Sequence, residues 1–330
     1  MRNRKWRVLS LLLVAVMTLG VLFGCSKDGG EKGSGGKGGK KDTIIIATMA
    51  EPPTLSPTEQ NAIASSYMNA LTFSQLTRMN EDMEMEGALA ESFENTSETE
   101  WVFHLRKGVK FHNGEEMTAD DVVTSITYAK TCPEINLYNA SVEKIEKVDD
   151  YTIKITTPGP SAILLSDLAH HGNAIMPKKL LDEGHNFSTD PIGTGPYKFV
   201  EWISGDHTTL TANEDYWGTK PAIKNIVIQV VADTNTQILG LQNGDYDVVR
   251  SPSIDVCTRL DGNADVAWDS TLSTGRISLY LNDWTGACKD INFRKAVQAG
   301  IDKQMINDGV YAGRSEILNV DMCSNYLSFV

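Results

Sequence analysis

The stretch from Glu100 to Ala129 constrains the fold of this chain more than any other. Its first residues alternate apolar and polar side chains over 101–106, which predicts a strand with one buried face. A Lys-Gly pair and an Asn-Gly pair then mark two turns. Thr118 with Asp121 three residues later is a variant of the capping box, so a helix should begin directly after Thr118. Three apolar side chains fall on one face of that helix: Val122, Ile126 and Ala129.

The N-terminus has the pattern of a secretory signal. Cations among the first seven residues precede an apolar run, Val8 to Phe23, that is short for a membrane span. The run ends in Leu22 to Cys25, which is similar to the bacterial lipobox, although Phe23 is bulkier than the residue usual there. We therefore expect residues 1–24 to be a signal peptide and Cys25 to be lipidated. Ordinary signal cleavage that leaves a thiol at Cys25 is the alternative.

The segment that follows predicts a tether. Residues 26–42 contain no apolar side chain and are rich in glycine and lysine. Such a segment buries too little surface to offset the entropy of ordering it, so 25–42 should be a lipidated cysteine with a flexible linker. Its lysines can also meet anionic lipid head groups. This arrangement predicts a protein anchored by lipid to the cell membrane and facing outside the cytoplasm.

Charge and cysteine spacing exclude several classes of function. The formal net charge of −13 argues against a nucleic-acid ligand. Besides Cys25, the chain has four widely spaced cysteines without a CxxC pair, so we expect no zinc site. One disulfide in this oxidising compartment and buried free thiols both remain open for these residues. They are Cys132, Cys257, Cys288 and Cys323.

Two segments predict buried or parallel strands. Thr43 to Thr48 is a run rich in β-branched residues, expected as a strand buried on both faces. Residues 226–249 read as strand, helix and strand, with Asn243-Gly244 ending the helix. Because such crossovers are right-handed, the two strands should lie parallel in one sheet. Ligands of such sheets bind outside the carboxyl ends of the strands, which places Arg250 and Ser251 at the mouth of a site. Arg250 could pair with a ligand carboxylate or be an ordinary surface cation.

Other segments complete the predicted order of elements. Residues 142–156 should form a hairpin, and 276–282 and 290–302 a strand and a helix. The glycines of Pro191 to Phe199 should serve a tight turn with unusual dihedral angles.

Several of these segments together resemble family 5 of the solute-binding proteins of ABC importers, the oligopeptide, dipeptide and nickel binders. The resemblance is carried by 100–129, 191–199, 213–218 and 290–302. It implies an α/β fold of the periplasmic-binding-protein-like type II class, with two lobes. It covers residues 43 to about 314, so we expect the second lobe to be truncated and the chain alone to bind solute weakly or not at all.

The resemblance also implies a division of the chain and a set of site residues. The first lobe with its core sheet would comprise 43–58 and 190–265, its subdomain with the signature region 59–189, and an incomplete second lobe 266–330. Asn61, Ala62 and Ile63 match positions that meet the ligand backbone, although Ile63 could instead begin the next helix and pack. Arg250 and Ser251 match cleft-facing positions, and Tyr280 would lie on a strand facing the cleft.

The expected function is binding without chemistry. Two lobes would close on a solute and deliver it to the permease and ATPase subunits of an importer, and the protein should be a monomer without cofactor, metal or catalytic residue. Peptides are the favoured solute because an extended peptide can hydrogen-bond strand-like backbone. A nickel chelate, another small solute, or a surface lipoprotein without a transport role are alternatives.

An enzyme is the competing class. The six histidines show no HExxH spacing, and no G-x-S-x-G motif occurs. His170 and His171 are adjacent, so on a strand their rings should point in different directions. His104 and His112 lie in the signature stretch and are more simply structural. The sequence therefore predicts no catalytic activity.

Overall fold

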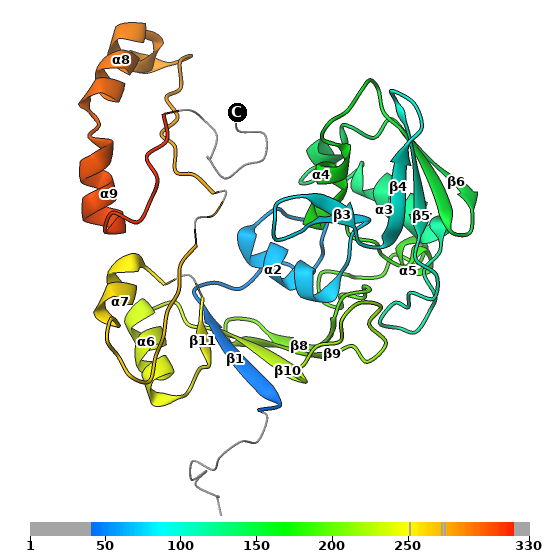
Figure 1. Cartoon of the computed structure of the whole chain (residues 1–330), viewed down its shortest axis with the longest axis horizontal. Coiled ribbons are helices and arrows are strands. Elements are labelled where there is room, and N and C mark those ends of the chain that lie inside the picture. Colours follow the sequence, from blue (N-terminus) through cyan, green and yellow to red (C-terminus); the bar gives the residue numbers. More distant parts are fainter. Residues whose placement is uncertain (1–40, 251, 272, 274, 320–330) are drawn as a thin grey trace, which may run out of the picture. The chain divides into compact units, whose positions relative to one another are not determined.

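The computed structural model describes residues 41–250, 252–271, 273 and 275–319 (Figure 1). The predicted signal peptide, Cys25 and nearly all of the predicted tether lie outside the described residues, as do Ser251 and Cys323. No helix within the described ranges is long and apolar enough to span a membrane.

A mixed five-stranded sheet joins segments that are distant in the sequence. Its strands, in spatial order, are β11 (Val248–Val249), β1 (Thr43–Thr48), β10 (Asn225–Val230), β9 (His207–Ala212) and β8 (Tyr197–Ile203). Strand β1 pairs in parallel with both β10 and β11, while β9 and β8 continue the sheet in antiparallel fashion (Figure 1). The predicted parallel arrangement around the crossover helix α6 (Thr234–Asn243) is confirmed, and Gly244 ends that helix at φ 81°.

One expectation for β1 is wrong. Ala47 is the strand's fully buried residue, and the other residues are half-buried. Ile44 and Ile46 pack into a core cluster with Leu55 and Met68, whereas Ile45, on the alternate face, remains half-buried. The apolar run therefore forms an inner strand of the sheet, but the described residues do not bury both faces of this strand.

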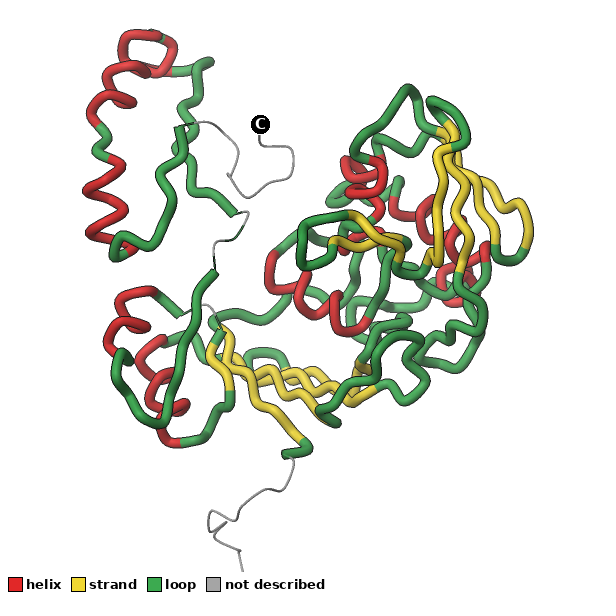
Figure 2. The backbone as a smooth tube through the Cα atoms, in the orientation of Figure 1, coloured by secondary structure: helices red, strands yellow, loops and turns green. Residues whose placement is uncertain are grey.

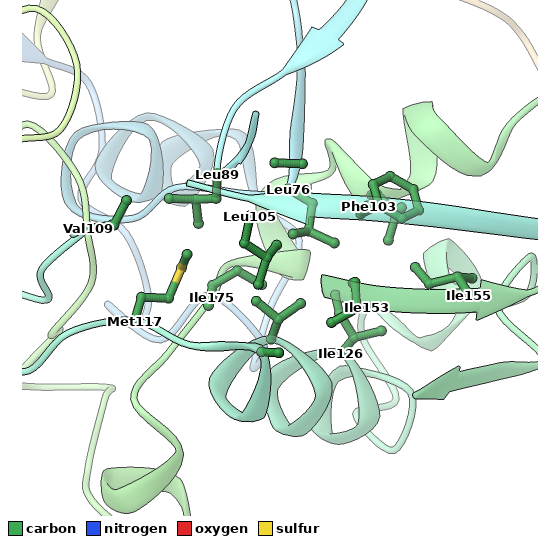
Figure 3. Close-up of a cluster of buried hydrophobic side chains, with 14 of the residues drawn as sticks. Leu76, Leu89, Phe103, Leu105, Val109, Met117, Ile126, Ile153, Ile155 and Ile175 are labelled. Atoms are coloured by element: carbon green, nitrogen blue, oxygen red, sulfur yellow. The ribbon is translucent and has the colours of Figure 1, made fainter. Parts of the chain in front are cut away.

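The signature stretch forms the core of a second, antiparallel sheet. Its strands, in spatial order, are β4 (Ala90–Asn95), β5 (Glu100–Leu105), β7 (Thr152–Thr156) and β6 (Lys144–Asp149), which run side by side in Figure 2. Helix α3 (Ala119–Ala129) begins with the predicted capping box, in which Thr118 N donates to Asp121 Oδ2 at 2.8 Å. Figure 3 shows Ile126 of this helix facing the strands that carry Phe103 and Ile153, and all three side chains are fully buried. The strand, the capped helix and the hairpin are thus confirmed.

The remaining elements are short. They are α2 (Ile63–Thr72), β2 (Thr77–Met79), β3 (Met85–Gly87), η1 (Asn136–Asn139), α4 (Leu164–Leu168), η2 (His171–Asn173), α5 (Lys178–Asp182), α7 (Ile254–Arg259), η3 (Gly286–Lys289), α8 (Ile291–Gly300) and α9 (Lys303–Tyr311).

Toward the C-terminus one prediction is confirmed and one is wrong. Helix α8 forms where a helix was predicted, and Asp290 caps it by accepting from Asn292 N at 2.8 Å. The strand predicted for 276–282 does not form, and no sheet in the described part of the chain includes this segment. Apolar side chains of this segment are exposed instead of paired across a sheet, and Ile277 is 83% exposed.

The glycines of the 191–199 segment have a different role from the one predicted. Neither Gly193 nor Gly195 has a positive φ. Instead, their backbone lies against the end of α2, and a Cβ on Gly195 would sit 2.5 Å from the Leu71 carbonyl oxygen. His112 also holds this backbone in place, since its Nε2–H donates to Gly195 O at 3.1 Å. These glycines are required by close approach rather than by a turn.

We expect Gly195→Ala to lower the free energy of unfolding by about 3 kcal/mol, because the added methyl group forces packed backbone apart. Chemical denaturation of the variant and of the unaltered chain measures this. Gly159→Ala is the matched control, since its Cβ would meet nothing within 4 Å. Equal stability of the two variants would contradict the role assigned to Gly195.

Candidate functional site

The carboxyl ends of three parallel strands meet at one edge of the mixed sheet. Arg250 N, just past β11, donates to Ala47 O of β1 at 3.1 Å. Val231 N, just past β10, donates to Thr48 O at 2.8 Å. The chain segments that leave β1, β10 and β11 therefore start side by side. Ligands of parallel sheets bind at this edge.

Arg250 reaches from this edge to helix α2. Its guanidinium carbon lies 2.8 Å from the centroid of the Tyr67 ring, a cation–π contact. Burial lowers the pKa of Arg250, and the adjacent Tyr67 hydroxyl partly offsets that effect. The side chain is half-buried, so Tyr67 fixes the position of a cation that still reaches solvent.

The N-terminus of α2 presents Asn61, Ala62 and Ile63 to solvent. Ala62 is the N-cap residue and has extended backbone, and its N–H donates to the side chain of Gln60. Ile63 does begin the helix, as the alternative had it, but its side chain is 71% exposed and does not pack. An exposed apolar residue beside exposed backbone at a helix start is a surface that can meet a ligand.

A stack of rings lies next to Asn61. Asn61 Nδ2 donates to Tyr138 Oη at 2.9 Å. The Tyr138 and His170 rings are stacked with centroids 3.6 Å apart and planes 8° apart, and the His171 ring follows at 4.2 Å. The expectation that the two histidines point apart is wrong, because they lie at the start of the short η2 turn rather than on a strand.

Both histidines of this stack are held neutral. Burial, followed by the proximity of His171, lowers the pKa of His170 to about 4. Burial also lowers the pKa of His171, against the opposing effect of the Gln60 backbone. In the described residues His171 Nε2 and Gln60 Nε2 are buried without a hydrogen-bond partner. The stack is therefore an uncharged aromatic surface at neutral pH.

The predicted site residues fall into two sets. Asn61, Ala62 and Ile63 are joined to Arg250 through α2, because Tyr67 lies one turn beyond Ile63. Tyr280 is 76% exposed and accepts a hydrogen bond from Arg276 at 3.4 Å. Across the described ranges no hydrogen bond or ring contact connects Tyr280 with α2 or Arg250. Ser251 and Cys25 lie outside the described residues.

Sequence reasoning missed Tyr67 and Tyr138. Helical spacing could have indicated Tyr67, which is four residues after Ile63 and so on the same face of α2. Nothing local indicates Tyr138, because its partners Asn61 and His170 are brought to it by the fold.

Comparison with known proteins decides the family. The family of bacterial extracellular solute-binding proteins, family 5 (middle region), matches residues 84–326. The chain belongs to this family. It is 28% identical to the oligopeptide-binding protein AppA of Bacillus subtilis, over 96% of this chain and 61% of that protein. It is 27% identical to heme-binding protein A of Haemophilus influenzae, over 84% of this chain and 56% of that protein.

Solved structures of solute-binding proteins have the same fold as this chain. The structure of AppA with a nonapeptide superimposes with a TM-score of 0.73 at 27% identity, covering 86% of this chain and 58% of that one. The structure of NikZ of Campylobacter jejuni with Ni(L-His) superimposes with a TM-score of 0.72 at 27% identity. The match covers 85% of this chain and 57% of that one. The chain thus spans about 60% of the length of the curated relatives it matches.

Membership confirms two predictions. The mixed α/β periplasmic-binding-protein fold is confirmed by these superpositions. The family is one of bacterial extracellular solute-binding proteins, which is the class that the sequence predicted. The solutes named for its relatives differ, from peptides to heme and a nickel chelate.

We expect the His170 ring of this family 5 protein to titrate with a midpoint near pH 4, because burial disfavours its charged form. Its neutral form therefore contributes stability that is present above pH 6.5 and is lost as the pH falls from 6.5 toward 4. NMR titration of the histidine Hε1 signals measures the midpoint. His207 is the internal control, since Asp206 and Glu201 raise its pKa above the usual 6.5. A midpoint near 6.5 for His170 would contradict the buried stack.

Proposed function

We propose that this chain is an extracytoplasmic solute-binding lipoprotein of an ABC importer, which captures peptides and delivers them to a permease and its ATPase. The observation that carries the proposal is the arrangement at the carboxyl edge of the sheet. There, exposed Asn61, Ala62 and Ile63 lie at the start of the helix that carries Tyr67, and Tyr67 contacts Arg250. Similarity to AppA, whose structure holds a nonapeptide, supports peptides as the solute class.

The site offers complementary groups for each part of a short peptide. The Arg250 guanidinium provides a fixed cation for a carboxylate, and a charge-assisted hydrogen bond of this kind is stronger than a neutral one. The Asn61 amide can bond main-chain groups, and Ile63 offers apolar contact. Ser251 and Tyr280 are proposed to join the site when the lobes close, by hinge motion that shifts the population toward a closed form.

The division into lobes is part of the proposal. Residues 43–58 and 190–265 would form the first lobe around the mixed sheet, 59–189 its subdomain, and 266–330 the beginning of the second lobe. The five strands of the mixed sheet all come from the two segments assigned to the first lobe, which supports the assignment.

A nickel chelate is the second candidate solute. The observation that favours it is the likeness to NikZ with Ni(L-His), at the same 27% identity as AppA. Among the described residues no group of three or more histidine, cysteine or carboxylate side chains could hold a metal ion. A chelate would therefore have to be recognised through its organic ligand, which is why peptides are preferred.

We expect trialanine to shift the Ile63 δ1 methyl signal in an NMR titration of the purified full chain, a measurement that detects millimolar binding. Arg250→Gln should weaken the binding of trialanine about tenfold, because the substitution removes a charge-assisted hydrogen bond. It should leave trialanine amide, which lacks the carboxylate, unaffected. Arg78→Gln is the matched control, an exposed arginine on β2. Equal weakening of both probes by Arg250→Gln would refute the carboxylate contact, and no shift with any peptide would refute peptide binding.

We also expect Cys25 to carry the lipid anchor. Cells fed an alkyne fatty acid should label the unaltered chain and the Cys132→Ala control, whereas Cys25→Ala should lose the label and leave the membrane fraction. Retained label in Cys25→Ala would contradict the anchor at that residue.

A further inference from the structure

The ring stack beside the candidate site has a fixed shape. Tyr138 and His170 lie face to face with centroids 3.6 Å apart. His170 Nδ1 accepts from Gly172 N at 3.1 Å, which caps the η2 turn and fixes the imidazole. A Cβ on Gly172 would lie 2.6 Å from the Ile135 side chain, so the turn also requires a glycine.

Buried amides lock the two turns that carry the rings. Asn139 Nδ2 of η1 donates to Asn173 Oδ1 of η2 at 2.7 Å. Asn173 Nδ2 in turn donates to Asp167 O at 2.7 Å and to Tyr138 O at 3.3 Å. Both asparagines are almost completely buried. The rings are therefore held in place before any ligand arrives, which reduces the entropy lost on binding.

The stack continues the proposed peptide site. Tyr138 is only half-buried and is bonded to Asn61, a member of that site. Leu137, the residue before it, is 75% exposed and adds an apolar neighbour. Burial keeps His170 uncharged at neutral pH. A neutral ring face with an exposed leucine beside it favours a planar apolar group over a charged one.

We propose that Tyr138, His170 and Leu137 form a subsite for an aromatic side chain of the bound peptide. The inference rests on the proposed function, since it names the kind of peptide that the same site prefers. Ile63 precedes Tyr67 by four residues, roughly 6 Å along the helix, and Asn61 lies two residues before Ile63, outside the helix. An extended chain covers roughly 3.3 Å per residue, so the aromatic residue should lie two or three positions before the carboxylate held by Arg250.

The test compares Phe-Ala-Ala, Leu-Ala-Ala and Lys-Ala-Ala in NMR titrations of the full chain. The unaltered chain should bind Phe-Ala-Ala about three- to tenfold more tightly than Leu-Ala-Ala, the range expected of an aromatic pair beyond its buried area. Tyr138→Leu removes the ring that stacks on His170. His170→Asn removes the second ring but keeps an acceptor for Gly172 N, so the turn should still form. Each of these two variants should bring the ratio of the affinities for Phe-Ala-Ala and Leu-Ala-Ala close to one. His104→Asn, on an exposed face of β5, should leave this ratio unchanged.

The outcomes separate the subsite from the proposed function. Binding of all three peptides with equal affinity, or a preference that survives both variants, overturns the subsite and leaves peptide binding intact. A preference for Lys-Ala-Ala also overturns it, because the rings would then serve a cation. Failure of all three peptides to bind overturns the proposed function together with the subsite.

Discussion

The parallel pairing of β1 with its two neighbours is the constraint on which the rest of the structure depends. Residues 43–48 pair with 225–230 on one side and with 248–249 on the other. This pairing brings the ends of three strands to one edge, although nearly 200 residues separate β1 from β11. Arg250 takes its position from that edge, since its N–H bonds β1 directly. The loop that leaves β1 leads into α2, whose first residues complete the candidate site.

Helix α2 connects that edge to the antiparallel part of the chain. Met68 packs into the core cluster of the mixed sheet, while the end of the helix contacts the backbone of Gly193 and Gly195. At its N-terminus Asn61 bonds Tyr138, which lies between the antiparallel strands in sequence. One helix of ten residues thus carries contacts to Arg250, to the glycine segment and, just before its start, to the ring stack. The position of α2 decides which side chains can meet a common ligand.

The sequence predicted those features that depend on local periodicity and capping. The strand, turns and capped helix of 100–129 follow from side-chain alternation and from Thr118 with Asp121, and all of them form. The parallel crossover around α6 follows from the strand–helix–strand order and the Gly244 stop. Features set by distant contacts were not predictable in this way. Gly195 is needed for close approach to α2, and the strand expected at 276–282 does not form in any sheet of the described residues. The Arg250–Tyr67 contact and the Tyr138–His170 stack join residues that only the fold brings together.

The most direct test of the account is a crystal structure of the full chain grown with trialanine. The account predicts peptide density against Asn61, Ala62 and Ile63, with its carboxylate at the Arg250 guanidinium. Density at another place, such as the shallow hollow lined by Arg106, Tyr216 and Trp217, with none at the carboxyl edge of the mixed sheet, would contradict it.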